Sequence, residues 1–214
     1  MKALIGGFLR QLVVAVVVLV SATVVLGLAY PAITWGISRI TASKAEGSVL
    51  TDARGCPAGS ALIGVDLRPA PGRPDGYLHS RVVGTADDPL APGSPASSSS
   101  SNLGPNNPVL ARAVAARRAA IAAREGVPPA QVPDDAVNGS ASGLDPDISP
   151  DYARLQIPRI SRATGIGTER VAAIIRANTR GRQWGFLGEP RVDVLRVNLA
   201  LGHTVATCPG PPGH

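Results

Sequence analysis

The sequence predicts an α+β protein: one N-terminal transmembrane helix followed by a single small α+β extracytoplasmic domain. Twenty residues from Gln11 to Tyr30 carry no charge, and about twenty apolar residues cross the core of a bilayer as a helix. The rest of the 214-residue chain has the length of one ordinary domain. Within it, helix-start signals and short apolar runs alternate with Gly- and Pro-rich stretches, which is typical of a small mixed domain.

The N-terminal apolar segment is interpreted as a retained membrane anchor. The alternative is a cleaved signal peptide, whose apolar region spans roughly 7–15 residues before a small-residue cleavage site. Gly27 to Pro31 forms only a poor site of that kind. We therefore expect four segments: a short cytoplasmic N-terminus at 1–10, a transmembrane helix at 11–34, the extracytoplasmic domain at 45–201 and a Pro/Gly-rich tail at 202–214.

The charges that flank the anchor do not fix its orientation by themselves. Lys2 and Arg10 precede the apolar run, and Arg39 and Lys44 follow it. Because long domains translocate largely regardless of charge, we place the N-terminus in the cytoplasm and the main domain outside. The sequence thus predicts a single-pass protein of the cell membrane, in contact with membrane lipid.

A stripe of small residues marks one face of the anchor. Ala15, Ala22 and Ala29 recur every seven residues. Small residues on one stripe let a second helix approach closely, so this spacing predicts an assembly face for a partner in the membrane. The alternative is coincidence in a segment rich in Val and Ala, and the spacing does not decide between the two.

The composition of the chain excludes nucleic-acid binding. The formal net charge of +6 is spread over scattered arginines, and aromatic residues make up only 3% of the chain. Proteins that bind nucleic acids gather their basic residues in a patch and often add stacking side chains. The two cysteines, Cys56 and Cys208, lie near the two ends of the outer domain, and both a disulfide and two free thiols remain open.

The first half of the outer domain is dominated by loop signals. Gly59 to Val65 is a short apolar run bounded by glycine, and it predicts a buried strand. Residues 66–108 then hold clusters of Pro and Gly, and Ser97 to Ser101 form an uninterrupted serine run. We interpret this stretch as a long loop within one domain and assign no role to the serines.

The second half of the domain begins with a clear helix signal. Asn107 can cap a helix and Pro108 suits its first position, so we expect a helix to about Glu125 that ends at Gly126. Its predicted buried stripe consists of Leu110, Val114 and Ile121. The arginines around this stripe are interpreted as a solvated face: Arg112, Arg117, Arg118 and Arg124.

Ser149 and Pro150 repeat the same start signal, and Asp151 in the first turn suits the helix dipole. Pro158 is expected to kink or break this helix before two glycines, Gly165 and Gly167, end it. The helix carries Leu155, Gln156 and Ile157, so one polar residue lies between two apolar ones, and Ile160 resumes the apolar face beyond the proline.

Two further elements complete the predicted domain. Thr168 is expected to cap a helix that is followed by Gly181, with a buried stripe of Val171, Ile174 and Ile175. From Val192 to Leu201 the pattern changes from strand alternation to helix spacing. We expect a short strand that runs into a short helix.

The chain lacks the common catalytic motifs. It contains no G-x-x-x-x-G-K-[ST] phosphate loop, no H-E-x-x-H zinc motif and no G-x-S-x-G nucleophile elbow. Its histidines, His79, His203 and His214, are far apart, and His79 is interpreted as a hydrogen-bonded structural or surface residue. No catalytic residue and no metal site is predicted.

Asp145, Asp147 and Asp151 remain the best candidates for chemistry. Read as a calcium loop from Asp145, the sequence places Pro150 where the EF-hand pattern needs glycine and Gln156 where it needs glutamate. We therefore favour a turn and a helix start. The alternative hypothesis is a membrane-anchored extracytoplasmic calcium-binding or hydrolase domain that uses these three aspartates.

Seven motifs occur together in one order. They are G-S-A-L-I-G at 59–64, Y-L-H-S-R at 77–81, S-N-L-G-P-N-N-P at 101–108, A-S-G-L-D-P-D-I-S-P at 141–150, Q-I-P-R-I at 156–160, G-E-P at 188–190 and V-N-L-A-L at 197–201. With them, residues 1–201 resemble the KdpC family, the C subunit of the potassium-transporting Kdp P-type ATPase. The serine run at 97–101 departs from the family's Gly-Gly-Ser-Asn-type segment, and the tail beyond Leu201 lies outside the resemblance.

The resemblance implies a non-catalytic subunit of a high-affinity, ATP-driven potassium uptake complex. The implied partners are a potassium-channel-like subunit, a P-type ATPase subunit and a small membrane peptide. In this family the C subunit stabilises the assembly and raises the ATP affinity of the ATPase subunit, as a catalytic chaperone. A glutamine associated with nucleotide binding maps onto Gln156. Whether ATP contacts this chain or acts only through the complex stays open, and potassium is the transported ion.

Overall fold

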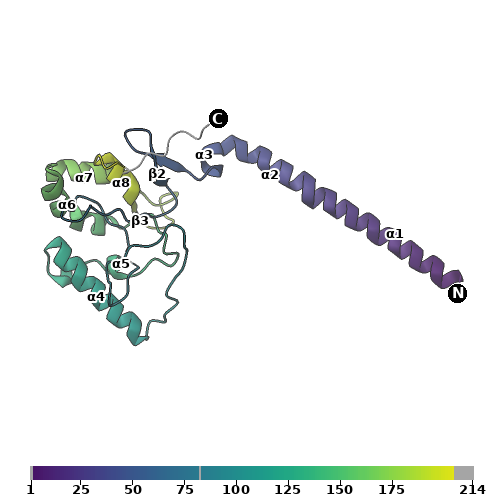
Figure 1. Ribbon diagram of the computed structural model, residues 1–214, viewed down its shortest axis with the longest axis horizontal. Helices are drawn as coiled ribbons and strands as arrows, with labels where there is room; N and C mark the ends of the chain where they lie inside the picture. Colours follow the sequence, from purple (N-terminus) through teal and green to yellow (C-terminus); the bar gives the residue numbers. More distant parts are fainter. Residues whose placement is uncertain (1, 82, 205–214) are drawn as a thin grey trace. The chain divides into compact units, whose positions relative to one another are not determined.

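The computed structural model describes residues 2–81 and 83–204 and divides the chain into two compact units, Met1–Ser48 and Val49–His214 (Figure 1). The first unit is helical throughout most of its length. Its elements are α1 (Lys2–Val24), a π-helical turn (Val25–Ala29), α2 (Tyr30–Ser38), a 3₁₀ turn (Arg39–Thr41) and α3 (Ala42–Ala45). The structure thus confirms a long apolar helix followed by a small α+β region.

The helical segment Ile5–Ala45 has the length and apolar character of a membrane span. The mean hydropathy of its 18-residue window is 2.9, and none of that window is buried within the chain. The segment expected to cross the membrane, residues 11–34, lies inside it. Helical geometry continues on both sides of the charge-free run, from Lys2 in α1 to Ser38 in α2.

A π-helical turn interrupts the anchor helix. The N–H of Tyr30 donates to the carbonyl of Val25, a bond five residues long that closes this turn. Pro31 is the second residue after this turn. A proline has no N–H to offer the carbonyl four residues before it, here Gly27, and its ring would clash with that carbonyl. A turn widened by about one residue makes room for the ring.

The second unit, called the outer domain after the location expected for it, begins with a two-stranded antiparallel sheet of β1 (Val49–Thr51) and β2 (Pro57–Ser60). The predicted buried strand at Gly59–Val65 is therefore wrong over most of its length. The Oγ of Ser60 accepts a hydrogen bond from the N–H of Leu62 and turns the chain, and Leu62 is 62% exposed. Gly64 then packs against another loop, where a Cβ would lie 2.3 Å from the carbonyl oxygen of Asp145.

Helix α4 (Pro108–Glu125) begins and ends as predicted. The side chain of Asn107 accepts a hydrogen bond from the N–H of Val109, and Gly126 ends the helix with a φ of 72°. The predicted faces are partly wrong. Ile121 is buried, but Leu110 and Val114 are only half-buried, and the helix also buries Ala113, Arg117, Ala122 and Glu125.

The arginines of α4 do not form one solvated face. Arg112 is exposed as expected, whereas Arg118 and Arg124 are half-buried and Arg117 is only 5% exposed. After α4 the chain continues into a 3₁₀ turn (Pro129–Gln131) and the short α5 (Asp134–Val137). Arg117 donates to the carbonyls of Gly84 and Val137, and Arg118 donates to the carbonyl of Val132.

Helix α6 (Pro150–Thr164) is capped by Ser149, whose Oγ accepts a hydrogen bond from the N–H of Tyr152. Pro158 lies inside α6 without breaking it. Both Pro158 and Arg154, the residue whose carbonyl loses its partner, lie on the exposed face, where water can satisfy that carbonyl. Gly165 ends the helix with a φ of 74°, as expected.

Helix α7 (Thr168–Ala177) comes next, with Gly167 rather than the predicted Thr168 at the capping position. Thr168 is the first helical residue, and no side chain caps this helix. Val171 and Ile175 are buried as predicted, while Ile174 is half-buried. Helix α7 packs on α6 (Figure 1).

A three-stranded antiparallel sheet with strand order β3-β5-β4 completes the domain. Its strands are β3 (Asp147–Ile148), β4 (Thr179–Arg180) and β5 (Arg191–Asp193). Strand β5 runs directly into α8 (Val194–Ala200), which confirms the predicted change from strand to helix. The main core joins this sheet to α4, α6, α7 and α8 through buried side chains that include Leu78, Ile121, Ile148, Tyr152, Ile160, Val192 and Val197.

Candidate functional site

Gln156 projects from α6 into the interior and is 0% exposed. Its Oε1 accepts hydrogen bonds from the backbone N–H of His79, at 2.9 Å, and from Nη2 of Arg159, also at 2.9 Å. Its Nε2 donates to the backbone carbonyl of His79 at 3.1 Å. The side-chain amide thus pairs with one residue of the early loop as a neighbouring strand would.

Asn198, from α8, holds Leu78, the residue before His79, in the same way. Its Oδ1 accepts from the N–H of Leu78 at 2.7 Å, and its Nδ2 donates to the Leu78 carbonyl at 2.9 Å. Leu78 and His79 are both buried, and neither belongs to a strand or a helix. Two buried amides from the C-terminal half therefore satisfy backbone groups that would otherwise be buried without partners.

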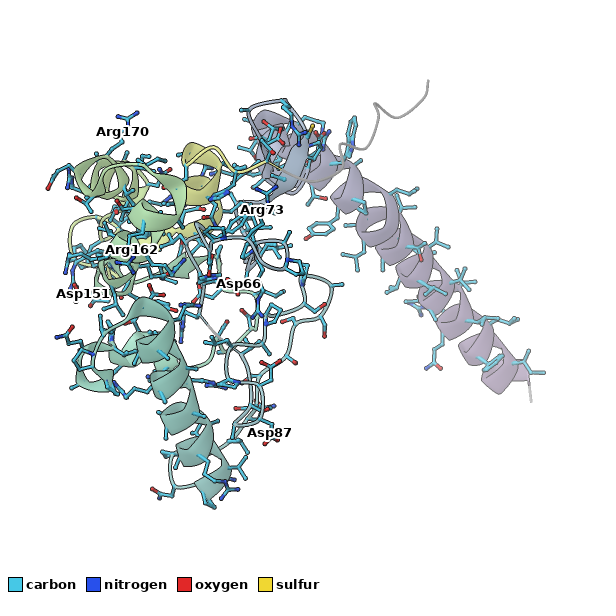
Figure 2. The ribbon with its side chains drawn as sticks, turned by 60° about the vertical axis from the view of Figure 1, so that its left-hand side comes forward. Asp66, Arg73, Asp87, Asp151, Arg162 and Arg170 are labelled. Carbon is cyan, nitrogen blue, oxygen red and sulfur yellow. The ribbon has the colours of Figure 1, made fainter. Side chains whose placement is uncertain are left out.

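The imidazole of His79 lies between two carboxylates. Its Nδ1 is 2.9 Å from Oδ1 of Asp66, and its Nε2 is 2.7 Å from Oδ2 of Asp75. Each ring nitrogen is thus within hydrogen-bond distance of one carboxylate oxygen, and the two carboxylates hold the ring from both sides. The expectation that His79 is a hydrogen-bonded structural residue is confirmed, and Figure 2 shows Asp66 inside the outer domain.

Both carboxylates are held in the ionised form. Burial raises the pKa of Asp75, but the hydrogen bond and charge of His79, with the charge of Arg159, outweigh it and lower this pKa to about 2. Burial likewise raises the pKa of Asp66, and the hydrogen bond and charge of His79 reverse the shift, so the pKa lies below its ordinary value. The two carboxylates and the imidazole, with Arg159 at 3.3 Å from Asp75, therefore form a hydrogen-bonded ionic unit rather than an acid/base pair.

Arg159 links this unit to α4. Its Nε donates to both carboxylate oxygens of Glu125, at 3.1 and 3.0 Å, and its Nη1 donates to the carbonyls of Asp75 and Tyr77. Arg124 also donates to Glu125, at 2.7 Å, and to the hydroxyl of Tyr152 at 2.8 Å. We call these side chains the Gln156 cluster: Asp66, Asp75, His79, Arg124, Glu125, Tyr152, Gln156 and Arg159.

Most of the Gln156 cluster was not predicted from the sequence. The spacing of Gln156 and Arg159, three residues apart on one helix face, was the available signal for two of its members. A cavity of about 100 Å³ lies beside the cluster and is lined by Asp75, His79 and Arg124, together with Arg68, Pro69 and Leu90. A volume of about 300 Å³ is the lower end for small-molecule sites, so this cavity is too small for a nucleotide.

The structure does not bring the three predicted aspartates to one site. Asp145 pairs with Arg81 at 2.9 Å, Asp147 with Arg191 at 3.0 Å and Asp151 with Arg154 at 2.7 Å. Among the residues that the structure describes, no three His, Cys, Asp or Glu side chains gather as metal ligands. Figure 2 shows Asp151 at the edge of the outer domain. The geometry thus favours the turn and helix start over the calcium or hydrolase hypothesis.

One aspartate of this group has a shifted pKa. Burial raises the pKa of Asp147, and the nearby charge of Asp193 raises it further, against the attraction of Arg191. The Oδ1 of Asp145 accepts a hydrogen bond from the N–H of Asp147, and Ser140 Oγ accepts from the N–H groups of Gly143 and Asp145. These bonds shape the turn that leads to β3 and α6.

Ala15, Ala22 and Ala29 are exposed along the anchor helix. Ala29 is the last residue of the π-helical turn. One extra residue in a turn rotates the part of a helix that follows by roughly a quarter of a turn, so the π-helical turn changes the register of the helix after Ala29. The role of the three alanines in assembly stays a prediction. A disulfide and two free thiols were the alternatives predicted for Cys56 and Cys208, and Cys208 lies outside the described part of the chain.

Comparisons with known proteins give one consistent result. The family model KdpC, described as K⁺-transporting ATPase, c chain, matches residues 12–203. The chain is 42% identical over 201 residues to the potassium-transporting ATPase KdpC subunit of Kineococcus radiotolerans, covering 94% of this chain and 97% of that protein. The protein of that name from Geobacter sulfurreducens is 42% identical over 90% of this chain and 97% of its own length. The one from Burkholderia vietnamiensis is 45% identical over 94% and 96%.

Proposed function

The chain belongs to the KdpC family, the c chain of K⁺-transporting ATPases, and on this premise we propose that it is a non-catalytic subunit of a high-affinity, ATP-driven potassium uptake complex. The extent of the similarity carries the proposal, since the matched residues include the anchor helix as well as the outer domain. Potassium is the ion that this complex transports. The buried, hydrogen-bonded Gln156 cluster supports a structural rather than a catalytic role for the outer domain.

In this proposal the chain crosses the cell membrane once, with its N-terminus in the cytoplasm and the outer domain on the other side. The anchor contacts a potassium-channel-like subunit, a P-type ATPase subunit and a small membrane peptide, and it stabilises their assembly. Ala15 and Ala22 support this role because their small side chains leave one exposed stripe of the helix open to close approach.

The chain also raises the ATP affinity of the ATPase subunit, and Gln156 contributes to this effect indirectly. Its amide is fully buried, and its oxygen already accepts two hydrogen bonds. A nucleotide could reach it only after those bonds open. A change at Gln156 therefore acts by releasing the His79 segment, and its effect on ATP passes through the surface that this segment supports.

Affinity purification of the tagged full-length chain from membranes tests the assembly role. The channel-like and ATPase subunits are expected to co-purify, and replacement of residues 1–38 by an unrelated transmembrane helix is expected to reduce their recovery. Equal recovery with the unrelated helix would contradict an assembly role for this anchor.

The ATP effect is tested by a matched pair of variants in the purified complex. Gln156→Leu and Asn198→Leu each remove one buried amide that holds the 78–79 segment. If Gln156 acts through the fold, both variants raise the apparent KM for ATP to a similar extent. An increase with Gln156→Leu alone, with the domain still folded, would instead assign the glutamine to nucleotide contact.

A further inference from the structure

A second, larger cavity lies in the outer domain and shares no residue with the Gln156 cluster. Its volume is about 540 Å³, and its walls come from residues 83–85, 92–103 and 138–143, with Leu110 and Arg117 of α4. Cavities that hold small molecules measure roughly 300–1,000 Å³. The serine run to which the sequence assigned no role, Ser97–Ser101, forms part of one wall.

Arg117 brings an unmatched charge to this cavity. Its guanidinium donates to the carbonyl of Gly84 through Nε and Nη2 and to the carbonyl of Val137 through Nη1. Of the buried charged residues in the described ranges, Arg117 alone has no partner of opposite charge, whereas Arg159 pairs with Glu125. Burial accordingly lowers the pKa of Arg117. A buried cation without a counter-charge is costly, so an anion beside it is stabilised.

The cavity offers donors and no competing acid. Arg117 is the only charged residue among its described lining residues. A guanidinium has five N–H groups, and the three bonds of Arg117 leave two of them available to a ligand. Four lining serines have side-chain hydroxyls without a hydrogen-bond partner among the described residues: Ser94, Ser97, Ser99 and Ser101.

Close backbone packing holds the serine loop against the opposite wall. A Cβ at Gly93 would lie 2.6 Å from the carbonyl oxygen of Gly143, and a Cβ at Gly143 would lie 2.9 Å from that of Ser99. The hydroxyl of Ser98 also donates to the carbonyl of Ser142 at 2.9 Å. The wall is thus built by specific contacts between two loops that are more than forty residues apart in the sequence.

We propose that this cavity binds a small oxyanion that also carries hydroxyl groups, such as the phosphate ester of a polyol, with Arg117 on the phosphate. Arginine recognises planar and tetrahedral oxyanions through charge-assisted bonds, and serine hydroxyls both donate to and accept from a polyol. The same chemistry is found in a free solute and in the headgroup of an anionic phospholipid. The volume exceeds that of a bare phosphate, which favours the ester.

Binding to the full-length chain in a neutral detergent tests the proposal. The probes for calorimetry are glycerol 3-phosphate, inorganic phosphate, glycerol and dihexanoyl phosphatidylglycerol below its micelle concentration. Glycerol 3-phosphate or the lipid is expected to bind saturably and at least about tenfold more tightly than glycerol, because the charged bond is lost with glycerol. Tighter binding of the lipid assigns the site to a headgroup, and tighter binding of the free ester assigns it to a solute.

Two variants and one control locate the site. Arg117→Gln is expected to weaken ester binding at least about tenfold, while Arg118→Gln removes the neighbouring guanidinium, which pairs with Asp134 outside the cavity, and leaves binding unchanged. If Arg117→Gln fails to fold, Ser99→Leu still fills the cavity from its exposed loop and is expected to abolish binding.

Three results would overturn the proposal: no saturable binding of any phosphate probe by the wild-type chain, equal binding of glycerol, or full binding by Ser99→Leu. The Ser99→Leu chain is expected to co-purify normally with its partner subunits. A failure of the oxyanion site is therefore distinguishable from a failure of the assembly role.

Discussion

Two polar regions of the outer domain differ in whether their buried charged side chains have partners of opposite charge. In the Gln156 cluster, His79 lies between two aspartates and Arg159 pairs with Glu125, so each buried charge has a partner. At the 540 Å³ cavity, Arg117 is equally buried and meets only backbone carbonyls. We infer from this difference that a network whose charges are all paired stabilises the fold. A buried charge without a counter-charge, beside hydroxyls that have no hydrogen-bond partner, instead indicates a ligand site.

Removal of one member of a buried pair should have the largest effect. Glu125→Leu leaves Arg124 and Arg159 buried without their shared carboxylate, and it is expected to destabilise the domain by about 3–5 kcal/mol. The urea midpoint of the full-length chain in detergent measures this loss. Glu189→Leu is the control, since Glu189 pairs with Arg182 at the surface and is expected to contribute at most about 1 kcal/mol. Equal midpoints for the two variants would contradict the structural role of the cluster.

Loss of a buried amide should have the next largest effect. Gln156→Leu leaves the N–H and carbonyl of His79 without partners, at about 1–3 kcal/mol for each unpaired group. Asn198→Leu does the same at Leu78 and is expected to match it. Because the two amides hold consecutive residues, the double variant should lose less stability than the two single variants together. Strict additivity in urea unfolding would show that they act independently.

Acid should weaken the Gln156 cluster by protonating Asp75. The ordinary pKa of an aspartate is 3.8, and that of Asp75 in the folded chain is about 2. The stabilisation is therefore fully present above about pH 4 and is lost as the pH falls towards 2. The urea midpoint of the wild type should drop across this range more steeply than that of Asp75→Asn. Parallel pH profiles would contradict the assignment of Asp75 as the charge that His79 and Arg159 hold.

The smallest effect is expected at the aspartate in the first turn of α6. Asp151 and Arg154 are 70% and 67% exposed, so Asp151→Asn should change stability by less than about 1 kcal/mol. Calcium at about 1 mM, enough to occupy even the weak sites of extracellular calcium-binding modules, should leave the thermal midpoint of the wild type unchanged. A calcium-dependent increase that Asp147→Asn abolishes would revive the metal hypothesis.

Local signals predicted the elements of the second half well. Asn107 and Ser149 are the caps of α4 and α6, and the change of pattern after Val192 marks the strand that becomes α8. Each of these depends on residues a few positions apart, which the sequence displays directly. The predicted strand at Gly59–Val65 ends at Ser60, where the hydroxyl of Ser60 turns the chain. Gly64 instead packs against Asp145, a contact across eighty-one positions that no local pattern contains.

The candidate sites depended on distant contacts and were largely missed. Arg117 is buried because Gly84 and Val137 supply carbonyl acceptors, and these are 33 and 20 residues away. Gln156 was singled out as a polar residue between apolar neighbours, but its partner His79 is 77 residues away. Periodicity shows which positions are buried in general, whereas the partner that permits a polar side chain to be buried comes only with the tertiary structure.

The amides of Gln156 and Asn198 also have a consequence for the order of folding. Between β2 and α4 the described residues form no helix or strand, and Leu78 and His79 in this stretch receive their backbone bonds from α6 and α8. During synthesis those helices emerge from the ribosome some eighty to one hundred and twenty residues later. The segment that is synthesised first therefore lacks these hydrogen-bond partners until α6 and α8 have been synthesised. During that time it is accessible to proteases or chaperones.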